Sequence, residues 1–332
     1  MATADSLGLP FADPALETRI RFRLAEMEDA LGVAIQSEAA FVNEAARHLL
    51  RAGGKRFRPL LLLLAAEFGD PDAPGVLPAA LVVELTHLAT LYHDDVMDEA
   101  DLRRGAPSAN ARWDNSVAIL TGDYLFAQAS DVVADLGPEA VRIQARTFVR
   151  LVQGQIRETI GPGDAADALG HYLSVVADKT GSLIATSARF GAMMSGAGVE
   201  IQVAMTEFGE HIGSAFQLSD DILDVASDFA DSGKTPGTDL REGVPTLPVL
   251  IAQQSTDPRD ARLLELLSSD LTDDVRHAEA LELLRAHGAM TEARAVVQRR
   301  ADQARALLAA MPDIPARRAL EGLCELVVTR SS

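Results

Sequence analysis

The chain has 332 residues, of which 48% are hydrophobic and 24% are charged, and its 49 acidic residues outnumber its 30 lysines and arginines. This composition excludes disordered and collagen-like proteins. The net charge of -19 argues against general nucleic-acid binding, because few cations are available to replace the counterions on a phosphate backbone. An anionic ligand would therefore have to be held locally.

Apolar residues recur at helical spacing through almost the whole chain, and alternating strand patterns are missing. Residues 1–14 contain two prolines and are predicted to be a flexible lead-in to a helix that begins near Pro14. We predict that residues 15–332 form a single all-α domain of ten or more helices. Its last part, from about residue 257, reads as an Arg/Glu-rich helical tail.

The compartment follows from what the sequence lacks. The one cysteine, Cys324, excludes an intramolecular disulfide and is typical of a reducing cytoplasm. The N-terminus does not have the pattern of a secretory signal, and the apolar run at 60–66 is much shorter than the roughly 20 residues that span a bilayer. We therefore expect a cytoplasmic protein without a transmembrane segment.

Two long apolar stretches, residues 77–98 and 203–224, end on the same acidic pattern, D-D-x-x-D. On a helix, residues four apart lie on one face about 6 Å apart, so each pattern places a carboxylate pair where a hard cation fits. Aspartate at a helix C-terminus is disfavoured by about 0.3–1 kcal/mol per charge, which a cation would offset. Oxygen ligands without cysteine predict Mg²⁺ or Mn²⁺. The six carboxylates are Asp94, Asp95, Asp98, Asp220, Asp221 and Asp224.

Only three of the 30 cationic side chains are lysines, and each lies in a polar segment that contains glycine. A compact ammonium suits phosphate, and a guanidinium fork binds it bidentately. Arginines accompany the first lysine and follow the first acidic pattern. Two acidic and at least two basic clusters indicate a pair of diphosphate groups held with metals. The cations are Lys55, Lys179, Lys234, Arg58, Arg103 and Arg104.

In this order, the segments GGKRFRP, HDDVMDEADLRRG, DKTG, FQLSDDILD and GKTPGTDL resemble those of the all-trans isoprenyl diphosphate synthases, over residues 40 to 255 or so. The resemblance implies the isoprenoid synthase fold, an all-helical bundle around a central cavity. It also implies a Mg²⁺-dependent prenyltransferase that condenses isopentenyl diphosphate head-to-tail onto an allylic diphosphate primer.

The resemblance also implies a role for each matching residue. The six aspartates would hold three Mg²⁺ ions, for which Mn²⁺ can substitute, against the allylic diphosphate. Catalytic groups near the developing carbocation would be Lys179, Thr180 and Gln217. Isopentenyl diphosphate would be bound by Lys55, Arg58, His87 and Arg104. The allylic diphosphate would be bound by Arg103, Lys179 and Lys234.

Spacing and local pattern qualify some of these roles. His87 precedes Asp94 by two helical turns, about 10 Å along one face, which supports its role as a ligand, whereas His93 is expected to be structural. Gly181 interrupts a helix, and such a break can turn backbone carbonyls toward the cation. Val244 stands where many relatives have a lysine, which removes one contact to the allylic pyrophosphate.

Product length in the family depends on the side chains just before the first aspartates, where bulky aromatics close the pocket early. This chain has Thr90 and Ala89 at the fourth and fifth positions before the motif, and Thr86 lies deeper. These small side chains predict a C30–C50 product. A short-chain C15–C20 synthase, farnesyl or geranylgeranyl, is the alternative.

Two other classes compete with this interpretation. A class I terpene cyclase also carries D-D-x-x-D, but its second motif is of the N-S-E type, which is replaced here by a second aspartate motif. A non-catalytic acidic partner or scaffold subunit gives no reason for intact aspartates or for lysines beside glycines. The resemblance further implies a homodimer, and it allows transient membrane contact when the product is released.

Overall fold

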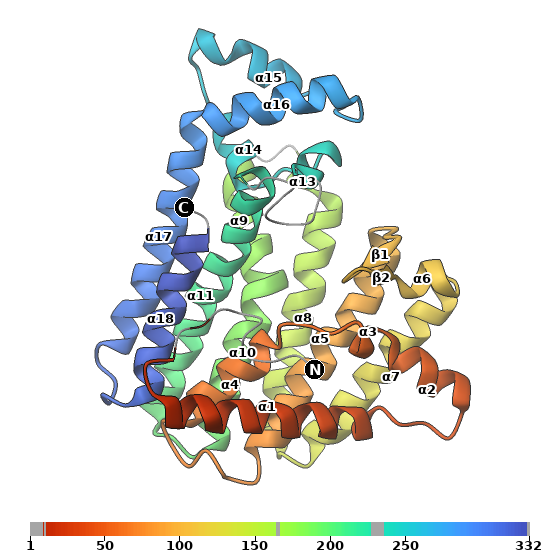
Figure 1. Cartoon of the computed structure of the whole chain (residues 1–332), viewed down its shortest axis with the longest axis vertical. Coiled ribbons are helices and arrows are strands. Elements are labelled where there is room, and N and C mark those ends of the chain that lie inside the picture. Colours follow the sequence, from red (N-terminus) through yellow and green to blue (C-terminus); the bar gives the residue numbers. More distant parts are fainter. Residues whose placement is uncertain (1–8, 10, 164–166, 227–235, 331–332) are drawn as a thin grey trace. The chain divides into compact units, whose positions relative to one another are not determined.

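The computed structural model describes residues 9, 11–163, 167–226 and 236–330, and helices dominate them (Figure 1). The chain divides into two compact units. The first unit comprises Met1–Val149, Leu183–Gly209 and Ala310–Gly322, and the second comprises Arg150–Ser182, Glu210–Ala309 and Leu323–Ser332. The predicted all-α class is confirmed, while the single domain over residues 15–332 stays a prediction.

Seven helices and one short hairpin belong wholly to the first unit. The hairpin pairs Leu102 with Pro107 and Arg103 with Ala106, antiparallel. The elements are α1 (Pro14–Ala34), α2 (Ala40–Ala46), α3 (His48–Arg51), α4 (Phe57–Ala66), α5 (Val76–Met97), β1 (Leu102–Arg103), β2 (Ala106–Pro107), α6 (Ala109–Arg112) and α7 (Asn115–Ala134).

The remaining elements lie in the second unit or contribute residues to both. Those wholly in the second unit are α9 (Ala168–Val176), the π-helix η2 (Ala177–Gly181), α13 (Thr238–Arg241), α14 (Leu247–Ala252), the 3₁₀-helix η3 (Pro258–Asp260), α15 (Ala261–Leu267), α16 (Asp274–Ala286) and α17 (Gly288–Leu308). Those with residues in both units are α8 (Pro138–Ile160), α10 (Ser182–Met194), α11 (Val199–Ala226) and α18 (Pro315–Arg330).

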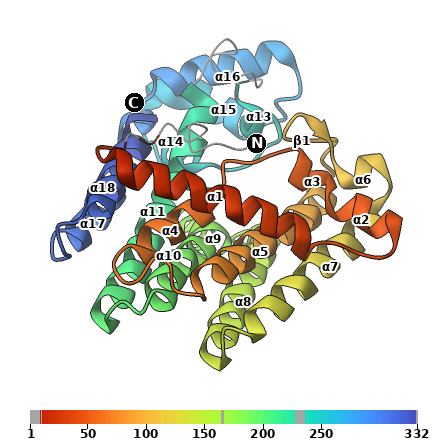
Figure 2. The same ribbon diagram turned by 60° about the horizontal axis from the view of Figure 1, so that its bottom comes forward.

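Helix α1 begins where the sequence predicted it. Asp13 caps the helix by accepting a hydrogen bond from the Leu16 N–H at 2.8 Å, and Pro14 occupies the first turn, where no intrahelical donor is needed. Residues buried at helical spacing, such as Leu16 and Ile20, fix one face of α1 against α4 and α5. Figures 1 and 2 show α1 lying across these two helices.

Helix α5 is the central element of the first unit. It packs against α1, α4 and α7 and ends in the first aspartate motif. Among the described residues it is the one helix long and apolar enough to cross a membrane, but 67% of its most apolar 18-residue window is buried inside the protein. That burial is typical of a core helix.

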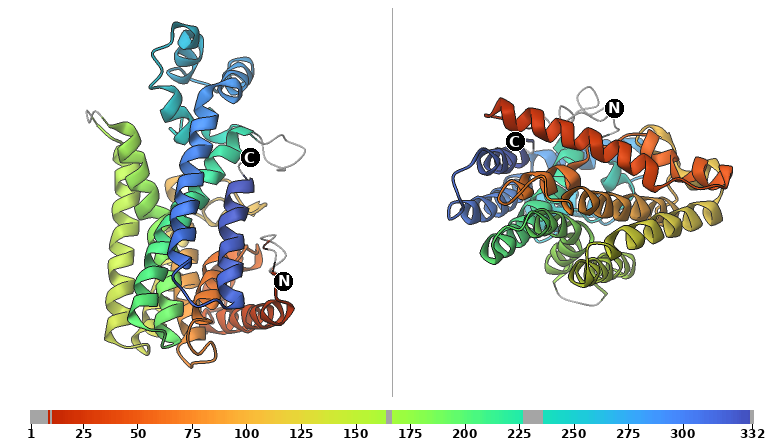
Figure 3. Two further views of the ribbon diagram at one scale, coloured as in Figure 1. Left: turned by 90° about the vertical axis from the view of Figure 1, so that its left-hand side faces the viewer. Right: turned by 90° about the horizontal axis from the view of Figure 1, so that it is seen from below.

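In the second unit, α14 packs against α17 and α9, and α15 packs against α16. Figure 3 shows these helices, with residues 261–308 in blue, from two further sides. The predicted helical character of the chain beyond residue 257 is confirmed by η3 and α15 to α18.

One buried guanidinium joins three helices of the first unit. Arg56 has a left-handed backbone with φ 50° at the start of α4, and its side chain is 3% exposed. Its Nη1 donates to Glu84 of α5 at 2.7 Å, and its Nε and Nη2 donate to Glu28 of α1. No role was predicted for Arg56 from the sequence, although it lies between Lys55 and the predicted ligand Arg58.

Replacing Arg56 with leucine should lower the free energy of unfolding by about 3–5 kcal/mol, because Glu84 would stay buried without its cation. Urea denaturation measures this change. The matched control is Arg142→Leu, which removes an exposed ion pair with Glu139 and should cost about 0–1 kcal/mol. Equal costs in the two variants would contradict the structural role of Arg56.

Candidate diphosphate and metal sites

The first aspartate motif lies at the C-terminal end of α5, in the first unit. The β1–β2 hairpin folds back on it, so that the Arg103 Nε donates to Asp95 Oδ1 at 2.5 Å, and the Arg103 Nη2 lies 4.0 Å from Asp98 Oδ2. Arg104 and Gly105 make the hairpin turn with positive φ angles of 54° and 76°. The aspartates and the first of the two arginines are therefore already paired in the protein.

The surroundings of Asp95 indicate whether the first aspartate motif suits a metal ion. Its side chain is fully buried, and its Oδ2 has no hydrogen-bond partner in the described part of the chain. Burial raises the pKa of Asp95, and the hydrogen bond from Arg103 only partly opposes this. A divalent cation would satisfy this oxygen, so the carboxylate suits Mg²⁺.

The described residues do not by themselves form a closed metal cage. No group of three or more histidine, cysteine, aspartate or glutamate side chains within them is arranged to hold a metal ion. Mg²⁺ commonly takes one or two carboxylates and completes its shell with water and substrate phosphates. The motifs therefore suit an ion that binds together with a phosphorylated substrate.

Three residues predicted to bind isopentenyl diphosphate, which are Arg58, His87 and Arg104, lie near one another in the first unit. Burial, followed by the charge of Arg58 and then Arg104, lowers the pKa of His87 well below its usual value, so this imidazole is neutral. Burial also lowers the pKa of Arg58 to about 10, and its Nε has no hydrogen-bond partner within the described residues. Three of the four residues predicted to bind isopentenyl diphosphate thus lie near one another, and the two arginines among them repel each other.

A loop of glycines shapes this cationic cluster. Arg104 donates to the backbone oxygens of Gly53 and Leu49. A Cβ on Gly54 would lie 2.8 Å from the Arg104 Nη1, so a larger residue there would displace the guanidinium from its present position. Lys55, the fourth predicted residue, is exposed beside the loop. A cluster of positive side chains in an acidic chain is a fitting site for an anion.

The second aspartate motif lies near the end of α11, in the second unit, and each of its carboxylates has a different partner. Asp221 is buried and accepts hydrogen bonds from the Tyr172 hydroxyl and, at 3.2 Å, from Gln217. Asp224 accepts from the backbone N–H groups of residues 238 and 239 at 3.2 and 3.1 Å. Asp220 accepts from Arg330 at 2.7 Å. Tyr172 and Arg330 were not predicted from the sequence.

Negative charge is crowded around Asp221. Burial, together with the neighbouring carboxylates of Asp239, Asp224 and Glu158, raises the pKa of Asp221 to about 8. A divalent cation would relieve this repulsion and stabilise the ionised form. The second motif therefore also fits Mg²⁺.

The π-helix η2 carries the predicted catalytic pair of the second unit. The break predicted at Gly181 is confirmed, because residues 177–181 form a π turn between α9 and α10. The Lys179 ammonium pairs with Glu158, and the Thr180 hydroxyl donates to Gln217 Oε1 at 3.2 Å. Thr180, Gln217 and Asp221 thus form one hydrogen-bonded chain.

Two further predicted positions fall elsewhere. Lys234 lies outside the described residues. Val244, which replaces the lysine of many relatives, is 42% exposed, and its N–H donates to Asp239 O at 2.8 Å.

The residues predicted to limit product length lie on α5. Ala89 and Thr86 are each 1% exposed, and Thr86 Oγ1 accepts from Gln144 of α8 at 3.4 Å. Thr90 is half-buried and donates to the His87 backbone oxygen. His93 contacts the Ile119 backbone oxygen on α7 at 3.1 Å, which agrees with its expected structural role.

Comparison with known proteins identifies the class of this fold and site. The polyprenyl synthetase family matches residues 39–284. Nonaprenyl diphosphate synthase of Mycobacterium tuberculosis is 50% identical over 324 residues, which are 97% of each chain. Component 2 of heptaprenyl diphosphate synthase from Geobacillus stearothermophilus is 40% identical over 90% of this chain and 93% of its own.

A solved structure gives the same result. Geranylgeranyl pyrophosphate synthase from Corynebacterium glutamicum, complexed with calcium and isoprenyl diphosphate, has a TM-score of 0.89 and 47% identity, covering 97% of this chain and 99% of its own. The fold and site define a prenyltransferase. The chain belongs to the polyprenyl synthetase family, whose members depend on Mg²⁺ and use isopentenyl and allylic diphosphates.

Proposed function

We propose that this chain is a Mg²⁺-dependent trans-polyprenyl diphosphate synthase, which adds isopentenyl diphosphate head-to-tail to an allylic diphosphate primer. The observation that carries the proposal is the presence of two intact D-D-x-x-D motifs in a chain of this family, each with a buried carboxylate that lacks full compensation. Each motif supplies ligands for Mg²⁺, three ions in all.

Three cations are proposed to bind the allylic diphosphate. Lys179 exchanges its ion pair with Glu158 for the diphosphate, and Arg103 and Lys234 add positive charge. Bound Mg²⁺ would stabilise the negative charge that develops as the allylic C–O bond ionises. The Thr180 hydroxyl and the Gln217 amide oxygen stabilise the carbocation by their dipoles.

Isopentenyl diphosphate is held by Lys55, Arg58, His87 and Arg104. Because His87 is neutral, it serves as a hydrogen-bond donor and not as a cation. The double bond of isopentenyl diphosphate supplies the electron pair of the new C–C bond, and a proton then leaves to the released pyrophosphate. No side-chain nucleophile is needed.

Elongation can be measured directly. Purified protein with Mg²⁺, isopentenyl diphosphate and a geranyl, farnesyl or geranylgeranyl primer should yield longer prenyl diphosphates, and removal of Mg²⁺ by EDTA should abolish the reaction. Asp94→Asn and Asp221→Asn should each lower the rate by about 100-fold or more, because the charge developed in the transition state loses stabilisation. Asp131→Asn, an exposed change on α7, is the control. No elongation with any primer, together with no Mg²⁺-dependent diphosphate binding, would overturn the proposal.

The product is proposed to be C30–C50. The small side chain of Ala89 and the 50% identity to a nonaprenyl synthase support this length. The 47% identity to a geranylgeranyl synthase keeps a C20 product as the second candidate. Size analysis of the products by chromatography separates the two.

Ala89→Phe should shorten the product, because a phenyl ring at this buried position removes space for the growing chain. Overpacking costs about 1–3 kcal/mol, so thermal unfolding is measured in parallel. Ala89→Ser, which adds one oxygen atom, is the matched control and should leave the product unchanged. A folded Ala89→Phe variant with the wild-type product distribution would contradict the role of Ala89.

We also propose a homodimer. Exposed apolar residues follow one face of α8, and each of them is 40–74% exposed to solvent. These residues are Val149, Val152, Ile156 and Ile160. Light scattering should give twice the mass of one chain, and Ile156→Glu should reduce it toward one. A single-chain mass for the wild type would favour a two-component enzyme, as the name of the Geobacillus relative describes.

We place the enzyme in the cytoplasm with transient membrane contact during product release, which cell fractionation tests.

A further inference from the structure

The π turn η2 has an unusual backbone geometry within an otherwise α-helical segment. A π-helix closes hydrogen bonds between residues five apart and is rare, and single π turns occur frequently at functional sites. Here the turn carries Lys179 and Thr180, and α-helices continue on both sides of it. Contacts from outside the turn must therefore stabilise this geometry.

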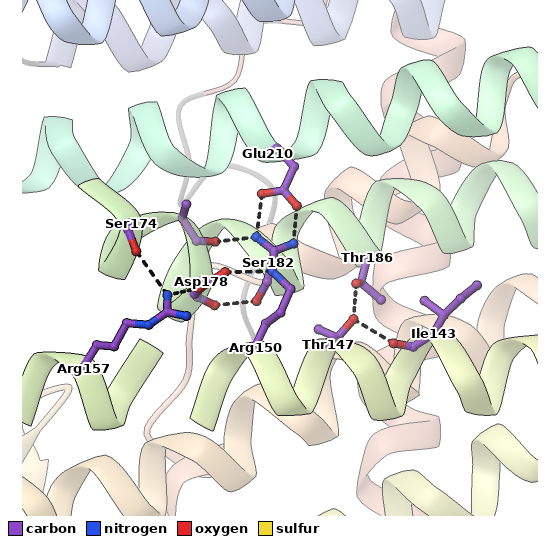
Figure 4. A network of polar contacts seen from close by, with 10 residues as sticks. Ile143, Thr147, Arg150, Arg157, Ser174, Asp178, Ser182, Thr186 and Glu210 are labelled. Atoms are coloured by element: carbon purple, nitrogen blue, oxygen red, sulfur yellow. Dashed lines mark hydrogen bonds and ion pairs between the residues drawn. The ribbon is translucent and has the colours of Figure 1, made fainter. Parts of the chain in front are cut away.

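Two arginines of α8 bind the first residues of the turn (Figure 4). Arg150 Nε donates to Asp178 Oδ1 at 2.8 Å, and Arg157 Nη1 donates to Asp178 Oδ2 at 2.6 Å. Arg150 Nη2 also donates to the Ala177 backbone oxygen at 3.3 Å. Both carboxylate oxygens of Asp178 and one carbonyl of the turn are thus satisfied from a single helix.

The same Arg150 guanidinium reaches α11. Its Nη1 and Nη2 each donate to one carboxylate oxygen of Glu210, and the hydrogen bond from Nη2 is 3.2 Å long. The hydrogen bonding of Arg150 to Glu210 is the largest cause that raises the pKa of Arg150 above its usual value. Glu210 precedes Gln217 by seven residues, two helical turns on one face. Arg150 therefore ties the turn to the helix that carries the partner of Thr180.

Helix α8 approaches the turn closely between these two arginines. Gly154 lies four residues after Arg150 and three before Arg157, so the three share one face. A Cβ on Gly154 would lie 2.7 Å from the Lys179 backbone nitrogen, closer than real contacts allow. The absence of a side chain brings α8 against the backbone of the turn, and the arginines fix its orientation.

We propose that Arg150 is a positioning residue that holds η2 in register with α11, so that Lys179 and Thr180 meet the allylic substrate. This inference rests on the proposed function of those two residues. Arg150 must satisfy three acceptors on two segments, the Asp178 carboxylate, the Ala177 carbonyl and the Glu210 carboxylate. A planar fork of donors can do this, and a lysine ammonium cannot.

Because the network is partly exposed, its effect on the position of the turn can be distinguished from its effect on the stability of the protein. The side chains of Arg150, Asp178 and Glu210 are 37%, 17% and 31% exposed, so solvent screens their attraction. Loss of the network should therefore affect the local geometry of the turn more than the stability of the whole protein.

The test compares Arg150→Lys and Arg150→Gln with the wild type and with Arg142→Gln, which removes an exposed arginine of the same helix. Without substrates, amide hydrogen exchange at residues 179–182 should become about tenfold faster in Arg150→Gln, because local opening is easier. Exchange elsewhere, the thermal midpoint and the Arg142→Gln control should stay unchanged.

Steady-state kinetics with Mg²⁺ supply the second readout. In both Arg150 variants the KM for the allylic diphosphate should rise, by about tenfold in Arg150→Gln and less in Arg150→Lys, with the KM for isopentenyl diphosphate unchanged. Unchanged exchange at residues 179–182, or an equal rise in both KM values, would overturn the inference. If the wild type fails to elongate any primer, the proposed function fails, but the exchange data still decide whether Arg150 holds the turn.

Discussion

Compensation of buried carboxylates is the constraint on which the described structure depends. The chain carries 49 acidic side chains against 30 lysines and arginines, so each carboxylate that folding removes from water needs a partner nearby. Arg56 pairs with the buried Glu84 between α4 and α5, and Arg103 pairs with the buried Asp95. Arg150 pairs in the same way with Asp178, which is half-buried. In each case one arginine also joins segments that are separate in the sequence, so the ion pairs organise the packing of the helices.

The candidate sites lie where this compensation is incomplete. Asp95 keeps one buried oxygen that has no hydrogen-bond partner among the described residues, and other carboxylates lie near Asp221. In both places negative charge is incompletely compensated, and a divalent cation would supply the missing positive charge. The opposite imbalance occurs around Arg58 and Arg104, whose positive charges repel each other beside the neutral His87. If the aspartate motifs hold metal ions with one diphosphate and the arginines hold a second, as proposed, binding would relieve both imbalances.

Features that depend on neighbouring residues could be predicted from the sequence. The start of α1 at Pro14, the two helices that end in aspartate motifs and the break at Gly181 all follow from local spacing, capping or glycine. The resemblance of ordered motifs identified the family, which the comparison confirms. Roles of single side chains in the site stay predictions.

Contacts between distant residues could not be predicted. Tyr172 and Asp221 are 49 residues apart, and Arg330 and Asp220 are 110 apart, and no periodicity of the chain encodes such pairs. The same holds for Arg150 and Glu210, which are 60 apart. Arg103 was interpreted as a ligand of the allylic diphosphate, and its ion pair with Asp95 was not foreseen, because a sequence motif does not show how a hairpin folds back.

The most direct measurement is a crystal structure of the protein with Mn²⁺ and an unreactive allylic diphosphate analogue, with the metal ions located by anomalous scattering. We expect Mn²⁺ at the first motif, bound to oxygens of Asp94, Asp95 or Asp98, and Mn²⁺ at the second motif, bound to oxygens of Asp220, Asp221 or Asp224. The Lys179 ammonium should lie on the diphosphate instead of on Glu158. A bound diphosphate with no metal at either aspartate motif would contradict it.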